Sequence, residues 1–347
     1  AGAGYLRTLS SASFPPLFFA EPFFSIFCWT CVANGAGIWY NIRKNWWAEG
    51  NKMRLGICTT DFAPAKAETL FRNMAEMGFE CVQLSFASLV ESGYAARGDW
   101  EIPPAIAPET VRLTRDCARR YGLEIVAVNG TYNMAHPDAA VRQEGARRFA
   151  LLARAAAELG AGMVSLCTGT RNRDSLWQVS PENDSAQAWR DMLEGVEQLL
   201  PQASALGLAL GVEVEASNVV NTPRRARDLL DACGSDSLKI IMDCANLFHV
   251  GRAHPRFVRE TIEEAFALLG SDIALAHGKD IRESAGIDFC PAGEGIVDFP
   301  FFLQSLARVG YQGDMVLHGA YEEGAIRKSA AFLRARLAEA DGGRTPA

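Results

Sequence analysis

Four apolar segments in the second half of the chain each end in a side chain that can bind a metal ion. They finish at Glu213, Asp243, His277 and His318. One such residue alone is commonly a loop cap or a satisfied core group. Four of them on successive segments indicate a shared site, because mixed carboxylate and imidazole ligands suit divalent ions such as Mn²⁺, Co²⁺ or Zn²⁺.

A second glutamate lies close to the first of these residues. Glu213 and Glu215 are two positions apart, so on a strand their side chains point to the same side. We predict Glu213 as the ligand, because it follows an apolar run comparable to those before Asp243 and His277. Glu215 would then reach over the metal and move protons as the catalytic base. A salt bridge to a loop arginine is the alternative role for Glu215.

The four segments belong to a repeating helix and strand pattern that begins at Met53. Amphipathic helical segments, for example 109–121, 138–159 and 223–233, end near a glycine, and a short apolar strand follows. Glycine suits the left-handed conformation that ends a helix. The junction glycines are Gly78, Gly122, Gly160, Gly207, Gly234, Gly270 and Gly310. The predicted strands are 55–60, 81–86, 124–129, 163–167, 209–213, 239–243, 273–277 and 315–318.

This alternation predicts an α/β fold, a (β/α)8 TIM barrel. Strands that alternate with helices form a parallel sheet, and eight such units in about 290 residues match the size of a TIM barrel. An open doubly wound sheet is the alternative, but it usually has a glycine-rich phosphate loop after its first strand. Residues 58–62 contain no glycine. A TIM barrel has its active site at the carboxyl ends of the strands, which is where the four potential ligands lie.

The composition narrows the class of protein. The chain has 347 residues, of which 49% are hydrophobic and 22% charged, and its formal net charge is −7. These values indicate a globular protein, and a pI near 5.4 argues against nucleic-acid binding, which needs a basic surface. The nine cysteines are odd in number and scattered, mostly in apolar runs, which predicts reduced core thiols in a cytoplasmic protein.

Residues 1–52 differ from the rest of the chain. They hold 12 of its 33 aromatic residues and only six charged side chains, without a helical or strand period. We predict an aromatic-rich extension outside the fold, with residues 53–347 as the catalytic barrel. A membrane anchor is the alternative, because the 18 residues 23–40 are uncharged and could just span a bilayer.

Several motifs resemble the sugar phosphate isomerase/epimerase family of xylose-isomerase-like TIM barrels. They are GVEVEASNVVNT at 211–222, MDCANLF at 242–248 and HGKD at 277–280, and PAGEGIVDF at 291–299 resembles the family's glycine-rich loop between strands seven and eight. The resemblance extends over roughly residues 53–340. It implies that Glu213, Asp243 and His277 are metal ligands.

The resemblance also implies residues that bind substrate. Asn246 falls where several relatives have a substrate-binding histidine, and Lys279 and Glu294 lie within the matching motifs. Lys279 and Asp280 are expected to form a structural ion pair, with orientation of the substrate as the alternative. Many ketose epimerases of the family end strand eight in a glutamate that ligates metal and acts as acid and base, whereas this chain has His318 there. His318 is predicted to bind the metal, but it does not supply a second carboxylate.

The predicted function is that of a divalent-metal-dependent isomerase or epimerase. It would act on a sugar, a sugar phosphate or a related polyol through an enediolate, with Mn, Co, Zn or Mg as the cofactor. A metal-dependent lyase or dehydratase that acts on a keto-sugar, keto-glycoside or inosose is the alternative, and a non-catalytic metal- or sugar-binding barrel is a third. The expected partner is a small carbohydrate, with no nucleic acid, no membrane and a possible homo-oligomer.

Further polar and aromatic residues follow the predicted strands on the same face. His136 is predicted to start a helix with Pro137 rather than to act in the site, and Arg171 is predicted as a solvated loop charge, with phosphate binding as the alternative. Trp100 and Trp177 lie in long loops, where an aromatic face would suit a sugar ring.

Overall fold

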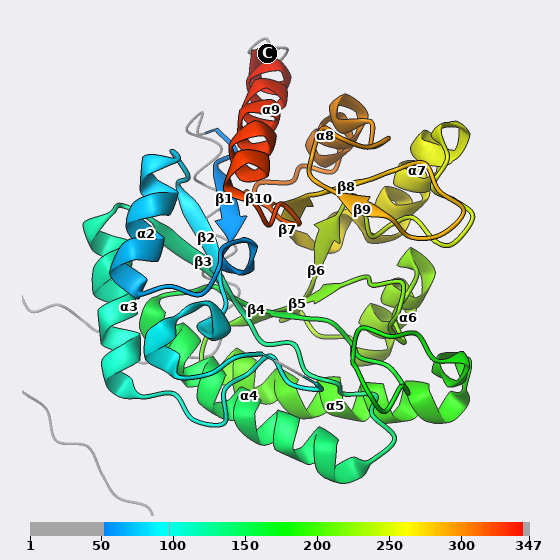
Figure 1. Cartoon of the computed structure of the whole chain (residues 1–347). Helices are drawn as coiled ribbons and strands as arrows, with labels where there is room; N and C mark the ends of the chain where they lie inside the picture. Colours follow the sequence, from blue (N-terminus) through cyan, green and yellow to red (C-terminus); the bar gives the residue numbers. More distant parts are fainter. Residues whose placement is uncertain (1–51, 97, 343–347) are drawn as a thin grey trace, which may run out of the picture. The chain divides into compact units, whose positions relative to one another are not determined.

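Eight parallel strands form a closed barrel in the computed structural model, which describes residues 52–96 and 98–342 (Figure 1). Around the barrel the strands follow the order β1-β10-β7-β6-β5-β4-β3-β2, and β10 closes it against β1. The barrel strands are β1 Leu55–Cys58, β2 Cys81–Leu84, β3 Glu124–Asn129, β4 Met163–Leu166, β5 Ala209–Glu213, β6 Leu238–Asp243, β7 Ile273–Gly278 and β10 Met315–Leu317. The TIM-barrel prediction is therefore confirmed.

Eight α-helices of the described residues follow these strands in turn. They are α2 Ala67–Glu76, α3 Pro108–Arg120, α4 Ala139–Leu159, α5 Ala186–Ala205, α6 Pro223–Cys233, α7 Val258–Leu269, α8 Phe299–Arg308 and α9 Glu323–Gly342. Each helix contacts the next, so that they surround the strands (Figure 1). Asp138, Ser185, Thr222 and Asp298 cap the starts of α4, α5, α6 and α8, because each side chain accepts a backbone N–H that the helix leaves unpaired.

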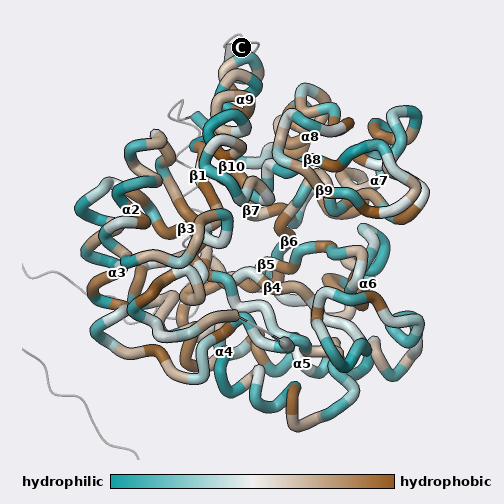
Figure 2. The backbone as a smooth tube through the Cα atoms, viewed as in Figure 1, coloured by the Kyte–Doolittle hydropathy of each residue, from teal (hydrophilic) through white to brown (hydrophobic). Residues whose placement is uncertain are grey.

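The alternation of the strand residues explains both the core and the site. Aliphatic residues facing outward pack against the helices, and Figure 2 shows the hydrophobic strands within the more mixed ring of helices. A smaller inner cluster consists of Cys58, Cys81, Val126, Ala127, Met163, Ile241, Leu275 and Val316. Ile241 and Leu275 each lie two positions before Asp243 and His277, so the same face of the strand that fills the interior also presents these polar side chains at its end.

Two details of the sequence prediction need correction. Six of the seven junction glycines have positive φ values between 55° and 81°, but Gly270 has a φ of −52° and begins a 3₁₀ turn. A Cβ at Gly270 would collide with Val309, so close packing rather than a left-handed backbone requires the glycine. The sequence pattern also missed a short antiparallel hairpin after β7, formed by β8 Asp280–Ile281 and β9 Phe289–Cys290.

The predicted extension lies outside the described residues, so both its boundary at residue 52 and the alternative membrane anchor at residues 23–40 stay predictions. Within residues 52–96 and 98–342, none of the helices is long and apolar enough to cross a membrane.

Candidate metal and catalytic site

Three of the four predicted metal ligands come together at the ends of adjacent strands. Glu213 ends β5, Asp243 ends β6 and His277 lies on β7, and one ligand atom of each lies within 4.8 Å of the other two. The Nδ1 atom of His277 is 3.6 Å from Oε2 of Glu213 and 3.5 Å from Oδ2 of Asp243. All three residues are buried, so the site lies inside the mouth of the barrel rather than on its surface.

The other polar atoms of these three side chains are held by protein groups. Oδ1 of Asp243 accepts the backbone N–H groups of Ala245 and Asn246 at 2.9 and 3.1 Å. Oε1 of Glu213 accepts Nδ2 of Asn246 at 2.6 Å. Nε2 of His277 lies 2.9 Å from Oε1 of Gln83 and donates to it, which leaves Nδ1 toward the carboxylates.

Two buried atoms at the centre have no hydrogen-bond partner in the described part of the chain. They are Oδ2 of Asp243 and Nδ1 of His277. A buried polar atom without a partner costs free energy unless something else satisfies it. Two carboxylate oxygens and one imidazole nitrogen fit a divalent metal ion. The other polar atom of each of these three side chains forms a hydrogen bond to the protein, and such contacts orient metal ligands.

The charges of the site also fit a divalent cation. Burial lowers the pKa of His277, but the carboxylates of Glu213 and Asp243 overcome this and raise it to about 9. Burial likewise disfavours the charged form of Lys279, yet the carboxylates of Asp243, Glu213 and Glu215 raise its pKa, so that it stays a buried cation. With the three carboxylates ionised, Lys279 protonated and His277 neutral, the formal charge of these five side chains is minus two. A divalent cation balances that charge.

Glu215, the predicted base, lies beside this group. It follows the end of β5 and is partly exposed, and its Oε2 accepts Nδ2 of Asn246 at 3.3 Å while its Oε1 accepts the backbone N–H of Ser217 at 3.2 Å. Burial raises the pKa of Glu215, and the ammonium group of Lys279 opposes that shift. Glu213 and Glu215 therefore approach the same asparagine, in agreement with the prediction that they face the same side.

Asn246 and Lys279 form a network with these carboxylates. The amide of Asn246 donates to Glu213 and Glu215, and its Oδ1 accepts Nζ of Lys279 at 3.0 Å. The same ammonium lies 3.6 Å from the centre of the Phe289 ring. Their predicted role in substrate binding stays a prediction, but the structure gives both residues a part in positioning the two glutamates.

The expected ion pair between Lys279 and Asp280 is not what holds these residues. Asp280 accepts the backbone N–H groups of Gly293, Gly295 and Val297, each at 3.0 Å, and so fixes the glycine-rich loop. Gly295 passes so close to the Asp280 carboxylate that a Cβ would overlap it. Glu294, predicted to bind substrate, is exposed on this loop, and its Oε2 lies 3.3 Å from Nη2 of Arg282.

His318 lies next to the three-residue group without being part of it. Its ring stands edge-on to that of His277, with the ring centres 5.6 Å apart. Its Nδ1 lies 3.1 Å from Oδ1 of Asp61, and Oδ2 of Asp61 accepts the backbone N–H of Ala320. If Nδ1 donates to this buried carboxylate, Nε2 is left as the atom that could meet a metal or a substrate. Metal binding by His318 stays a prediction.

Sequence reasoning missed Glu101 and Gln83. Glu101 lies in the long loop between β2 and α3, and its Oε2 accepts Nδ2 of Asn129 at 2.6 Å. Burial raises the pKa of Glu101 to about 7, although the hydrogen bond from Asn129 opposes the shift. The signal for Glu101 was its place beside Trp100 in a loop on the catalytic face, whereas Gln83 is an ordinary residue inside a strand and gave no signal.

Other residues of this face have structural roles. His136 starts α4 as predicted, since its Nδ1 accepts the backbone N–H of Asp138. Arg171 is not a solvated charge, because its side chain is buried and pairs with Asp191 at 2.6 Å. The ring of Trp100 lies under the guanidinium of Arg148 at 4.5 Å, whereas Trp177 is 45% exposed.

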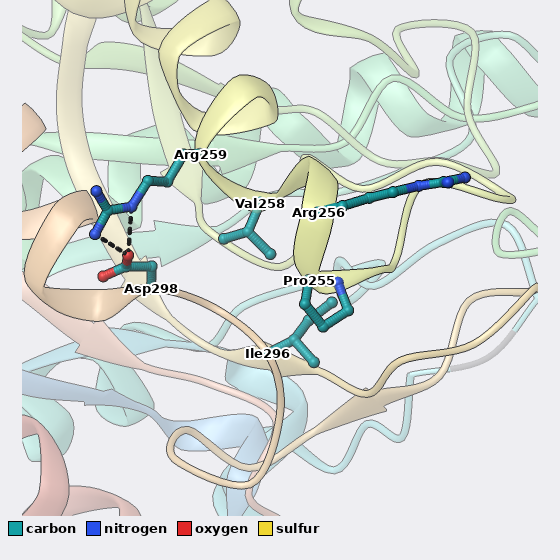
Figure 3. Close-up of a pocket in the computed structure, with 6 residues that line it drawn as sticks. All are labelled: Pro255, Arg256, Val258, Arg259, Ile296 and Asp298. Carbon is teal, nitrogen blue, oxygen red and sulfur yellow. Dashed lines mark hydrogen bonds and ion pairs between the residues drawn. The ribbon is translucent and has the colours of Figure 1, made fainter.

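A separate hollow lies at the start of α7. It has a volume of about 320 Å³ and is lined by Pro255, Arg256, Val258, Arg259, Ile296 and Asp298. Figure 3 shows that Arg259 turns toward Asp298, with which it forms an ion pair of 2.9 Å. That arginine is therefore neutralised, and none of the three potential metal ligands lines the hollow.

The fold is similar to that of several solved structures. A D-tagatose 3-epimerase-like protein matches with a TM-score of 0.65 and 17% identity over 84% of this chain and 99% of that one. A Mycobacterium smegmatis xylose isomerase-like TIM barrel protein in complex with magnesium has a TM-score of 0.63 and 16% identity, with 83% and 97% covered. The 3-keto-D-glucoside 4-epimerase of E. coli has a TM-score of 0.60 and 18% identity, with 82% and 100% covered.

Identities this low show the shared fold alone. A search of curated protein sequences gives no significant match. The family model of the xylose isomerase-like TIM barrel matches residues 71–336, most of the barrel. The chain therefore belongs to the xylose isomerase-like TIM barrel family, as the motifs around Glu213, Asp243 and His277 indicated.

Proposed function

We propose that the protein is a divalent-metal-dependent isomerase or epimerase that acts on a sugar, a sugar phosphate or a related polyol. The observation that supports this most is a pair of buried atoms that have no hydrogen-bond partner among the described residues, Nδ1 of His277 and Oδ2 of Asp243, with Oε2 of Glu213 beside them. Glu213, Asp243 and His277 would hold the ion. The sugar epimerases among the structures of similar fold agree with this proposal.

The neighbouring side chains supply the proton chemistry. A bound divalent cation would lower the cost of the negative charge that develops on the oxygens of a hydroxyketone. Glu215 removes the proton next to the carbonyl, since it is partly exposed and its raised pKa makes it a stronger base than an ordinary glutamate. Asn246 keeps Glu215 beside Glu213, and the ammonium of Lys279 keeps these carboxylates from repelling each other.

A metal-dependent lyase or dehydratase is a second candidate. It is favoured by the residue after the eighth barrel strand, which is His318, held by Asp61, and not a glutamate. A lyase needs only one base, because the leaving group departs after proton removal. Such an enzyme would exchange a substrate hydrogen with solvent without inverting the carbon.

A screen with added metal tests the proposal. The protein, freed of metal with a chelator, is supplied with Mn²⁺, Co²⁺, Zn²⁺ or Mg²⁺ and tested on D-fructose, D-tagatose, D-allulose, inososes and 3-keto-D-glucosides. Isomerised or epimerised product should form only with metal. Elimination products alone would favour the lyase, and full activity of the chelated protein would refute the metal site.

The variant Asp243→Asn provides the structural test. It keeps the shape of the side chain and removes one charge, so metal affinity should fall by about tenfold or more. Asp228→Asn is the matched control, because Asp228 is exposed on α6. Equal metal affinity in both variants would contradict the assignment of Asp243.

A further inference from the structure

The backbone around Glu101 is fixed to the catalytic end of the barrel. The N–H of Glu101 donates to the carbonyl of Thr131 at 3.0 Å, and Trp100 pairs with Tyr132 in an isolated bridge. Thr131 and Tyr132 directly follow β3, so these contacts hold the loop after β2 against the carboxyl end of the next strand. Glu101 is thereby placed at the same end of the barrel as Glu213 and Asp243.

The Glu101 side chain is held by a hydrogen-bond donor and not by a cation. Nδ2 of Asn129 donates to its Oε2 at 2.6 Å. Within residues 52–96 and 98–342, no lysine or arginine forms an ion pair with Glu101. The side chain keeps partial solvent exposure, so its carboxyl group is accessible to a small molecule although protein surrounds it.

Glu101 lies at the same end of the barrel as the proposed metal site, over different strands. Glu215, Asn246 and Lys279 follow β5, β6 and β7, whereas Glu101 is attached to β3 and follows β2. β3 lies two strands and β2 three strands away from β5 in a barrel of eight, so Glu215 and Glu101 belong to different parts of the barrel rim.

A chain of hydrogen bonds connects Glu101 to the site beneath the mouth. Ser165 donates to Oδ1 of Asn129 at 3.2 Å, and Gln83 donates to Oγ of Ser165 at 3.2 Å. Oε1 of Gln83 meets Nε2 of His277 at 2.9 Å.

We propose that Glu101 is the second acid–base residue of the site, because the eighth strand is followed by His318 and so supplies no second carboxylate. The proposal rests on the proposed function and narrows it to an epimerase, an enzyme that inverts a carbon next to a carbonyl. Burial raises the pKa of Glu101 most, the hydrogen bond from Asn129 and the neighbouring His318 oppose that shift, and the charge of Glu213 adds to it. A pKa of about 7 lets Glu101 give or take a proton near neutral pH.

The proton balance of the step is complete without a further reactant. Glu215 takes the proton from the carbon on one face, and the electron pair of that C–H bond moves toward the carbonyl oxygen. Glu101, protonated at the start, gives its proton to the opposite face of the same carbon as the electron pair returns. Glu215 ends protonated and Glu101 ionised, and exchange with water restores both. In the reverse direction the two residues exchange roles.

The test compares Glu101→Gln with Glu215→Gln in metal-loaded protein and in D₂O. The probes are the two epimers of the ketose pair that the wild type interconverts, taken from D-fructose, D-tagatose, D-allulose and 3-keto-D-glucosides. Each variant should keep its metal content and lose inversion by at least about 100-fold. Each should still exchange the hydrogen of one epimer only, and the two variants should act on opposite epimers. Glu101→Asp, which keeps an acid, should recover part of the inversion.

Glu109→Gln serves as the matched control, because Glu109 is an exposed carboxylate at the start of α3, the helix after the same loop. Normal inversion by Glu101→Gln would overturn the proposal. Loss of metal from Glu101→Gln would also overturn it, since Glu101 would then act through Gln83 and His277 as a positioning residue. If the wild type inverts none of the probes, the proposed function itself fails, and that outcome is distinct from the other two.

Discussion

The strongest quantitative prediction concerns the proton that His277 must lose when metal binds. In the metal-free protein, the carboxylates of Glu213 and Asp243 hold the pKa of His277 at about 9. Only the neutral imidazole can donate Nδ1 to a metal ion. At pH 7 nearly every metal-binding event should therefore release one proton from His277.

The size of the effect follows from that pKa. Two pH units below 9, deprotonation of His277 costs about 2.7 kcal/mol, so the metal affinity at pH 7 should be about 100-fold weaker than its plateau above pH 9. The affinity should rise about tenfold per pH unit up to that plateau. Isothermal titration calorimetry with Mn²⁺ in buffers of different ionisation enthalpy measures both quantities, and the number of protons released is the slope of heat against buffer enthalpy.

The same pKa predicts an opposite trend in the stability of the metal-free protein. The folded-state pKa of His277 is raised from 6.5 to about 9, so its contribution to stability is complete below pH 6.5 and is lost as the pH rises through 9. The loss should be up to about 3 kcal/mol. Metal binding without proton release at pH 7, or an affinity that does not change between pH 6.5 and 8.5, would refute the reasoning.

Further predictions concern other residues. Gln83→Leu should weaken metal binding about 10- to 100-fold in a metal titration, because Gln83 orients His277, and unchanged affinity would contradict that role. Glu215→Gln should lower turnover at least about 100-fold with its metal content intact. In metal-free protein, Glu101→Gln should gain stability over the wild type as the pH rises above 4.5, reaching about 3 kcal/mol above pH 7 in urea unfolding, since the raised pKa of Glu101 makes its ionisation costly in the folded state. A chain that starts at Met53 should melt at the same temperature as the full chain, because the closed barrel is complete without a strand from residues 1–52.

Local signals in the sequence were enough to predict the barrel and the three residues at its centre. Helix-ending glycines and apolar strands gave the element order, and β3, β5 and α6 begin and end at the predicted residues. Glu213, Asp243 and His277 could be predicted together because strand ends of a parallel barrel meet at one edge. Gly270 does follow the last residue of α7, but it serves packing against Val309 and does not have the left-handed conformation.

Contacts between distant segments could not be predicted from local patterns. Gln83 meets His277 across 194 residues of sequence, and Asp61 meets His318 across 257. Lys279 and Asp280 are neighbours of opposite charge, so an ion pair was a reasonable expectation, but Lys279 bonds to Asn246 and Asp280 to the backbone of the glycine-rich loop. Glu101 depends on a long loop whose path is fixed by Thr131 and Asn129, and nothing in its local sequence shows that path.

The central claim is that Glu213, Asp243 and His277 hold a divalent metal ion. The most direct measurement is anomalous diffraction at the manganese absorption edge, from crystals grown with Mn²⁺. We predict one strong peak within the barrel mouth, from an ion bonded to Oε2 of Glu213, Oδ2 of Asp243 and Nδ1 of His277. The peak should be lost in Asp243→Asn. No peak at these three atoms, or a peak ligated by other residues, would contradict it.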